Sequence, residues 1–167
     1  MRRRAAVVLA CVVAFGACGG SGKSDVSSLG SQRRRLVVND QPTSLCLTLA
    51  TTAAQQSAGL SHRDTLPPNE GMAFVFGGTA THAFWMKDTH FPLAILWVAG
   101  DGQIRGSNLM APDTTQLYDS PGPVATVIEL APQDWAPLAA SAHTATLGPV
   151  CPGTLTAGRP GTKPAQF

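Results

Sequence analysis

The sequence predicts a mainly β protein, folded as a compact β-sandwich or barrel-like domain with one or two short helices. Three observations support this fold class. The 167 residues include 17 Gly and 13 Pro, which indicates many turns and disfavours long helices. About seven short apolar segments alternate with turn-forming residues, as in all-β domains. With 44% apolar residues, the chain is long enough to bury a core.

The first half of the predicted domain contains one helix among its strands. We expect strands at 36–38 and 45–49, where apolar and β-branched residues cluster. Thr51 and Thr52 provide a cap for a short helix over 53–58, which Gly59 would end. Further strand and loop segments are expected in this half, namely a loop at 67–71, a buried strand at 72–76 and an extended run at 81–87.

The second half begins with the clearest hairpin signal in the chain. Two apolar runs, at 93–98 and 104–110, flank the sequence Gly100-Asp101-Gly102. The elements predicted after this hairpin are a strand at 124–130, a short helix at 132–140 and a last strand at 144–147.

Residues 1–17 have the pattern of an export signal. Three arginines start the chain, and the 13 uncharged residues 5–17 match a secretory signal but are too few to span a bilayer. Small residues precede Cys18 and a Gly/Ser-rich stretch follows it, which resembles a bacterial lipoprotein site. We therefore expect Cys18 to carry lipid and to anchor the protein on the outer face of the cell membrane. Cys11 is a rival site, and a signal cut near Ala17 without lipid is the alternative.

Residues 18–35 are interpreted as a flexible tether that ends in three adjacent arginines. These arginines either favour an anionic lipid surface or only keep the linker solvated. The globular domain is expected over 36–151, and a Gly/Pro/Thr-rich tail over 152–167 is expected to be disordered.

Cysteine usage agrees with export. If Cys11 leaves with the signal and Cys18 is lipidated, Cys46 and Cys151 form an even pair, and a disulfide between them is expected in an oxidising compartment. The alternative is two buried thiols. The sequence contains no CxxC spacing, so a redox or zinc role for these cysteines has little support.

Charge excludes one class of partner. The full chain has a net charge of +2, but residues 36–167 hold five cations and nine acids, a net charge of −4. The basic excess therefore belongs to the signal and the tether. A mildly acidic domain is not expected to bind nucleic acid.

A series of motifs carries a family resemblance. In order they are residues 59–60, 66–68, 71–76, 84–89, 92–96, 101–102, 110–112 and 129–130. The series resembles the domain of unknown function 192 family over about residues 45–150, and Phe84-Trp85-Met86-Lys87-Asp88-Thr89 is its most specific part. The resemblance implies a compact β-rich domain, often behind an export signal, and no established reaction. Ser61 and Ala94 stand where Met and Asp are expected, and residues 113–115 lack cysteines that many relatives carry.

The most specific motif also holds the candidate ligand-binding residues Trp85, Lys87 and Asp88. A cation and an anion follow a buried run there, beside an indole that can serve as an apolar wall for a polar or anionic ligand. The alternative is structural, with Lys87 extended along the surface and Asp88 in a turn. A copper site at His82, Met86 and His90 is disfavoured, because positions four apart on one strand lie about 13 Å apart. We expect no metal and no cofactor.

Catalytic motifs are missing from the sequence, which has no nucleophile elbow, zinc-protease motif or P-loop. Glu129 is notable because it lies within an apolar strand and must face solvent, pair with Lys87 or Arg105, or titrate abnormally. A paired structural carboxylate is favoured over an active-site role. The sequence thus predicts an exported, lipid-anchored domain that binds a small ligand or a cell-envelope protein without catalysis. An unrecognised enzyme and an envelope assembly factor are the alternatives.

Overall fold

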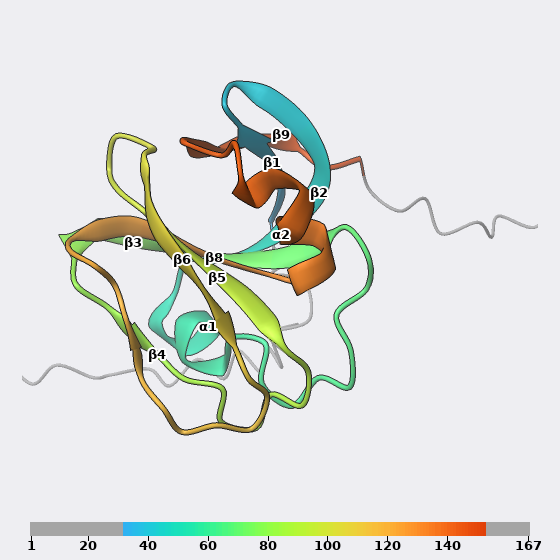
Figure 1. Ribbon diagram of the computed structural model, residues 1–167, viewed down its shortest axis with the longest axis vertical. Coiled ribbons are helices and arrows are strands. Elements are labelled where there is room, and N and C mark those ends of the chain that lie inside the picture. The colour runs from blue at the N-terminus through green and yellow to red at the C-terminus, as the bar shows by residue number, and fades with distance from the viewer. Residues whose placement is uncertain (1–31, 153–167) are drawn as a thin grey trace, which may run out of the picture. The chain divides into compact units, whose positions relative to one another are not determined.

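The computed structural model describes residues 32–152 (Figure 1). These residues form a mainly β fold with two short helices, which confirms the predicted fold class. The predicted signal, the lipidation site Cys18 and most of the predicted tether and tail lie outside the described residues. In the described part, no helix is both long enough and apolar enough to cross a membrane.

Seven strands form one sheet in the order β6-β5-β8-β3-β2-β1-β9. Their bounds are Arg33–Val38 (β1), Gln41–Ala50 (β2), Glu70–Ala80 (β3), Leu93–Val98 (β5), Ile104–Met110 (β6), Val124–Leu130 (β8) and Ala145–Val150 (β9). Strands β2 and β3 are parallel, and every other neighbouring pair is antiparallel. An isolated bridge between Gln103 and Thr144 brings one end of edge strand β6 to the start of β9. This bridge is a single pair, and the described residues form no closed barrel.

The remaining elements cover the sheet. Helix α1 is Ala53–Ala58 and is capped by Thr52 with a capping box, as the sequence predicted. Helix α2 is Pro132–Ala139, and its Trp135 is buried. A second, two-stranded sheet pairs β4 (Ala83–Phe84) with β7 (Tyr118–Asp119).

Two apolar cores pack on the two faces of the large sheet. All six residues of β5 are buried, and they alternate between the cores: Ala94 and Leu96 join Trp135 in one core, and Ile95 and Trp97 face the other. The second core also takes in Leu60, which follows α1, together with Met86 and Phe84 from the segment around β4. This second face carries the candidate site described below.

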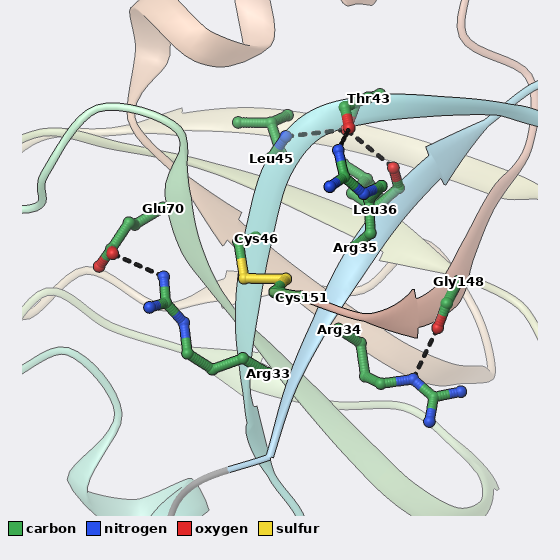
Figure 2. Close-up of a disulfide and its surroundings, with 10 residues drawn as sticks. All are labelled: Arg33, Arg34, Arg35, Leu36, Thr43, Leu45, Cys46, Glu70, Gly148 and Cys151. Atoms are coloured by element: carbon green, nitrogen blue, oxygen red, sulfur yellow. Dashed lines mark hydrogen bonds and ion pairs between the residues drawn. A yellow bond between two sulfur atoms is a disulfide. The ribbon is translucent and has the colours of Figure 1, made fainter. Parts of the chain in front are cut away.

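The predicted disulfide forms. Cys46 on β2 and Cys151, just after β9, are bonded with their Cα atoms 6.1 Å apart (Figure 2). The bond joins segments 105 residues apart in the sequence. A disulfide of this kind indicates an oxidising, extracytoplasmic compartment.

The folded part begins earlier than residue 36. Arg33, Arg34 and Arg35, predicted to end the tether, form the first half of β1 and pair with β2. Each guanidinium has its own partner: Arg33 pairs with Glu70 at 2.5 Å, Arg34 donates to the Gly148 carbonyl and Arg35 to the Thr43 carbonyl (Figure 2). Adjacent cations looked like a solvated run, but their partners lie across the β1–β2 hairpin or in distant segments, which local composition does not reveal.

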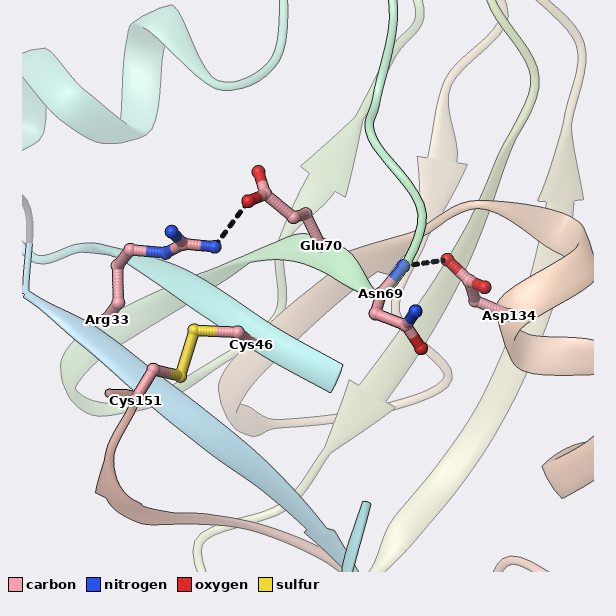
Figure 3. Close-up of polar contacts among 6 residues, drawn as sticks. All are labelled: Arg33, Cys46, Asn69, Glu70, Asp134 and Cys151. Atoms are coloured by element: carbon pink, nitrogen blue, oxygen red, sulfur yellow. Dashed lines mark hydrogen bonds and ion pairs between the residues drawn. A yellow bond between two sulfur atoms is a disulfide. The ribbon is translucent and has the colours of Figure 1, made fainter. Parts of the chain in front are cut away.

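Further polar contacts near the disulfide fix the start of β3 (Figure 3). Glu70, the first residue of β3, accepts a hydrogen bond from the Arg33 guanidinium and forms an ion pair with it. The preceding Asn69 donates its backbone N–H to the Asp134 carboxylate of α2 at 3.1 Å. The Asn69 carbonyl in turn accepts from the Cys46 N–H at 2.8 Å. These contacts position β3 against β2, where the parallel pairing begins.

The extended run predicted over 81–87 is wrong in its second half. Only Ala83 and Phe84 are in a strand, and the chain turns after them. The Thr89 N–H donates to the Met86 carbonyl at 3.1 Å, and Asp88 has a left-handed backbone with φ 57°. The strong β propensity of Phe84 and Trp85 concealed this turn, which follows the fully buried Met86.

Candidate functional site

A pocket of about 430 Å³ opens on the second face of the sheet. Its volume falls within the range typical of small-molecule sites. Four parts of the chain line it: residues 56–62 at the end of α1 and beyond, Phe74 and Phe76 of β3, the β4 region over residues 82–85 and 87–89, and Glu129 of β8.

The three residues predicted to bind a ligand all line this pocket. Trp85 is 54% exposed, and the Nζ atom of Lys87 lies 5.8 Å from the centre of its indole ring. Asp88 is half-buried. The structure thus brings Trp85, Lys87 and Asp88 together, with the tryptophan and the lysine at the exposed rim.

Backbone hydrogen bonds hold the segment that carries these residues. Met86 is fully buried, and its N–H donates to the Thr114 carbonyl at 3.0 Å. The Asp88 carbonyl accepts from the N–H of His62 at 2.8 Å, which joins this segment to the loop after α1. The rim is therefore made of two loops that are anchored to the core and to each other.

Glu129 lies in the wall of the pocket and is only 4% exposed. It is on the central strand β8, where its register neighbours are Met72 of β3 and Ile95 of β5, both apolar and buried. Burial disfavours the ionised carboxylate and raises the pKa of Glu129 to about 8. The side chain is therefore mostly a neutral acid at pH 7.

The structure does not show the ion pair with Lys87 or Arg105 that the sequence favoured for Glu129. Among residues 32–152 neither predicted partner forms an ion pair with it: Arg105 lies 3.5 Å from Asp101, and Lys87 lies over Trp85. The alternation along β8 was predicted correctly, because Val127 belongs to the second core, whereas Ile128 and Leu130 belong to the first. The sequence placed Glu129 on the correct face but did not show that this face holds a pocket.

His82 is a second titratable group at the pocket, and it is half-buried. Its ring stacks on Phe76 with centroids 3.6 Å apart and planes 13° apart. Desolvation lowers the pKa of His82, so the imidazole is neutral at pH 7. Its Nε2 atom is buried, and within the described part of the chain it has no hydrogen-bond partner.

The three residues of the disfavoured copper site lie in different environments. Met86 is in the core, His82 stacks on Phe76, and the Nδ1 atom of His90 contacts the Asp113 carboxylate at 2.8 Å on the exposed surface. Across residues 32–152, no cluster of three or more His, Cys, Asp or Glu side chains is arranged to hold a metal ion.

The sequence did not identify the opposite wall of the pocket. Gln56 of α1 donates through Nε2 to the carbonyls of Ala50 and Val75, and this links the helix to the sheet beside the pocket. His62 and Phe74 also line the site. The nearest signal was Gly59, which was expected to end α1 and does so with φ 51°.

Comparison with known proteins establishes the family. A family model for DUF192, described as uncharacterised ACR, matches residues 35–140. The protein belongs to the DUF192 family. The match includes both loops at the rim of the pocket and Glu129. Comparison with curated proteins gave no match to this DUF192 protein.

Two solved structures resemble this DUF192 protein. One is a candidate transcription regulator from Sinorhizobium meliloti, 34% identical, with a TM-score of 0.63 over 70% of this chain and 92% of that one. The other is a protein of unknown function from Novosphingobium aromaticivorans, 24% identical, with a TM-score of 0.59 over 68% of this chain and 83% of that one. The second likeness concerns the fold alone.

Proposed function

We propose that this DUF192 domain binds a small ligand in the pocket rimmed by Trp85, Lys87 and Asp88. The observation that carries the proposal is the burial of Glu129 in the pocket wall without an ion-pair partner among residues 32–152. A buried carboxyl group without a partner costs folding free energy, so a purely structural wall would favour an apolar residue there. Perturbed titratable groups in a cleft are a common mark of functional sites.

The exposed rim supports the same proposal. Trp85 leaves more than half of its surface in solvent, although indoles are usually largely buried. An exposed aromatic side chain beside a cavity offers a ligand a large contact area at little conformational cost. Binding of this kind explains the arrangement better than an envelope assembly factor that has no pocket.

We further propose that the domain acts outside the cytoplasm, held at the outer face of the cell membrane through lipid on Cys18. The Cys46–Cys151 disulfide supports the oxidising compartment, and the residues before Cys18 support the lipid anchor. Replacing Cys18 by Ser is expected to move the protein from the membrane fraction to the soluble fraction. Continued membrane retention of this variant would contradict the anchor.

A second candidate function is acid–base catalysis on the bound molecule, with Glu129 as acid and His82 as base. The observation that favours it is that both groups line one pocket and that burial shifts their pKa values in opposite directions. The two candidates separate by the fate of the ligand: a binding protein releases it unchanged, whereas an enzyme releases a product of different mass.

Native mass spectrometry of the full chain, purified in detergent, tests the binding proposal. We expect a co-purified small molecule that is lost from Trp85→Ala. The matched control is Leu109→Ala, which removes an apolar side chain of similar exposure, 69%, from β6 outside the pocket. A ligand retained equally by both variants, or no ligand in the wild type, would contradict the proposal.

A further inference from the structure

We propose that the ligand of this pocket is an organic cation, an ammonium group attached to an apolar body, with the Glu129 carboxylate as its counter-ion. The inference rests on the proposed function and names the ligand class of the same site. It follows from the burial of the acidic groups relative to Lys87 and from the aromatic residues that line the pocket.

The acidic groups of the pocket are more buried than its lysine. Glu129 is 4% exposed and Asp88 is half-buried, whereas Lys87 is exposed. The Lys87 ammonium lies over the Trp85 ring, and it makes no ion pair with Glu129. An anion beside Glu129 would meet an acidic side chain, whereas a cation would supply the ion-pair partner that Glu129 does not have among residues 32–152.

Aromatic rings form part of the remaining wall. Phe74, Phe76, Phe84 and Trp85 all line the pocket. The faces of such rings carry a negative electrostatic potential and attract ammonium groups. The contact between Lys87 and Trp85 is an example within the protein itself. The volume of about 430 Å³ leaves room for an ammonium group and an apolar body.

Binding of a cation must be coupled to the loss of a proton. The carboxyl group of Glu129 is mostly neutral at pH 7, because burial raises its pKa to about 8. The other titratable groups of the pocket are His62, His82, Lys87 and Asp88, and the strand neighbours of Glu129 are the apolar Met72 and Ile95. An ammonium ion therefore binds the ionised form of Glu129, and the proton leaves to the buffer.

Isothermal titration calorimetry with three ligands of equal size tests this inference. The ligands are benzylamine, benzyl alcohol and benzoate, which differ in charge but share one ring. We expect benzylamine to bind the full chain about tenfold more tightly than the other two. Its affinity is expected to rise by up to about tenfold between pH 6 and 7, with close to one proton released, as heats in buffers of different ionisation enthalpy report.

Two variants make the test specific. Glu129→Gln keeps the size of the side chain but cannot ionise, so benzylamine affinity is expected to fall by about tenfold and proton release to vanish. Asp40→Asn is the control, because it removes an exposed carboxylate from the turn between β1 and β2, which does not line the pocket. Its benzylamine affinity and proton release are expected to equal those of the wild type.

The outcomes separate the two proposals. Benzylamine that binds no more tightly than benzyl alcohol or benzoate, or that does not bind, overturns the cation inference. The same holds for benzylamine binding that Glu129→Gln leaves unchanged. A co-purified ligand that depends on Trp85 would then still support the pocket, whereas its absence would overturn the proposed function itself.

Discussion

His62 donates its backbone N–H to the carbonyl oxygen of Asp88 at 2.8 Å, and this bond joins the two loops that form the rim of the pocket. Both residues have left-handed backbones, with φ values of 59° and 57°. Neither is a glycine, so each position carries a conformational cost that the surrounding contacts offset. The geometry of the rim therefore depends on residues at positions 62 and 88 that tolerate a left-handed backbone.

The first prediction concerns the backbone of Asp88. Asp88→Val is expected to lower the free energy of unfolding by about 1–2 kcal/mol, because a β-branched side chain is poorly accommodated at positive φ. Asp88→Asn is the matched control and is expected to change stability little, since Asn also adopts this conformation. Urea unfolding followed by fluorescence measures both variants, and equal stability of the two would contradict the role of the backbone.

The second prediction concerns the pH dependence of stability. The pKa of Glu129 rises from about 4.5 in the unfolded chain to about 8 in the folded protein. The folded state therefore keeps a proton that the unfolded state loses. The contribution to stability is fully present below pH 4.5, falls by up to about 1.4 kcal/mol per pH unit as the pH rises, and levels off above pH 8.

Removing the titrating group tests this sign. Glu129→Gln is expected to retain more of its stability than the wild type when urea unfolding is compared at about pH 5 and about pH 8. The Asp40→Asn variant, which alters an exposed carboxylate, is expected to follow the wild type. Parallel pH profiles for Glu129→Gln and wild type would show that Glu129 is not a buried neutral acid.

The third prediction concerns the disulfide. Cys46 and Cys151 close a loop of about one hundred residues, for which the chain-entropy model gives about 4–5 kcal/mol of stabilisation. Replacing both by Ala is expected to lower the free energy of unfolding by several kcal/mol. Urea unfolding of the double variant and of the oxidised wild type measures the difference. Equal stability would indicate that the bond contributes nothing, and two alkylatable thiols in the native protein would refute the bond itself.

The fourth prediction concerns a close backbone approach next to Glu129. A Cβ atom at Gly71 would lie 2.5 Å from the Glu129 carbonyl oxygen and 2.6 Å from Leu130 Cδ2. Gly71→Ala is expected to lower the free energy of unfolding by about 1–3 kcal/mol through overpacking. The control on the same strand is Gly77→Ala, where the added Cβ atom meets no heavy atom of another described segment within 4 Å. Comparable effects of the two substitutions would argue against the packing of β3 on β8.

Much of the fold follows from local sequence patterns. The strands at 93–98, 104–110 and 124–130 have the bounds that apolar runs and turn residues predicted, and α1 begins at the cap that Thr52 indicated. In each of these elements the intrinsic propensity, the apolar pattern and the terminal residues all favour the same secondary structure. Cysteine counting found the Cys46–Cys151 bond, because an exported chain with two remaining cysteines leaves one pairing.

Long-range partners escaped prediction. The arginines 33–35 read as a charged linker, yet each guanidinium contacts a segment that is distant in sequence or across the hairpin. The two-residue strand β7 at Tyr118–Asp119 was not foreseen either, since it exists only through pairing with β4. Local patterns carry no signal for such contacts.

The candidate site was predicted only in part, because some of its residues come together only through long-range contacts. Trp85, Lys87 and Asp88 are adjacent in the sequence, so one motif revealed them together. Glu129 and His82 reach the same pocket only through the sheet and the turn after β4. Charge pairing favoured a partner for Glu129, but the cations that the sequence offered are engaged at Asp101 and Trp85.

The most direct test of the central claim is a carbon-13 NMR titration of the Glu129 carboxyl group, with and without benzylamine. The pocket proposal predicts a pKa of about 8 without ligand, and the cation inference predicts that saturating benzylamine lowers it. Glu129→Gln assigns the signal by its loss. A pKa in the ordinary range of a solvated glutamate without ligand, or a raised pKa that benzylamine leaves unchanged, would contradict a buried carboxyl group that takes a cation as its partner.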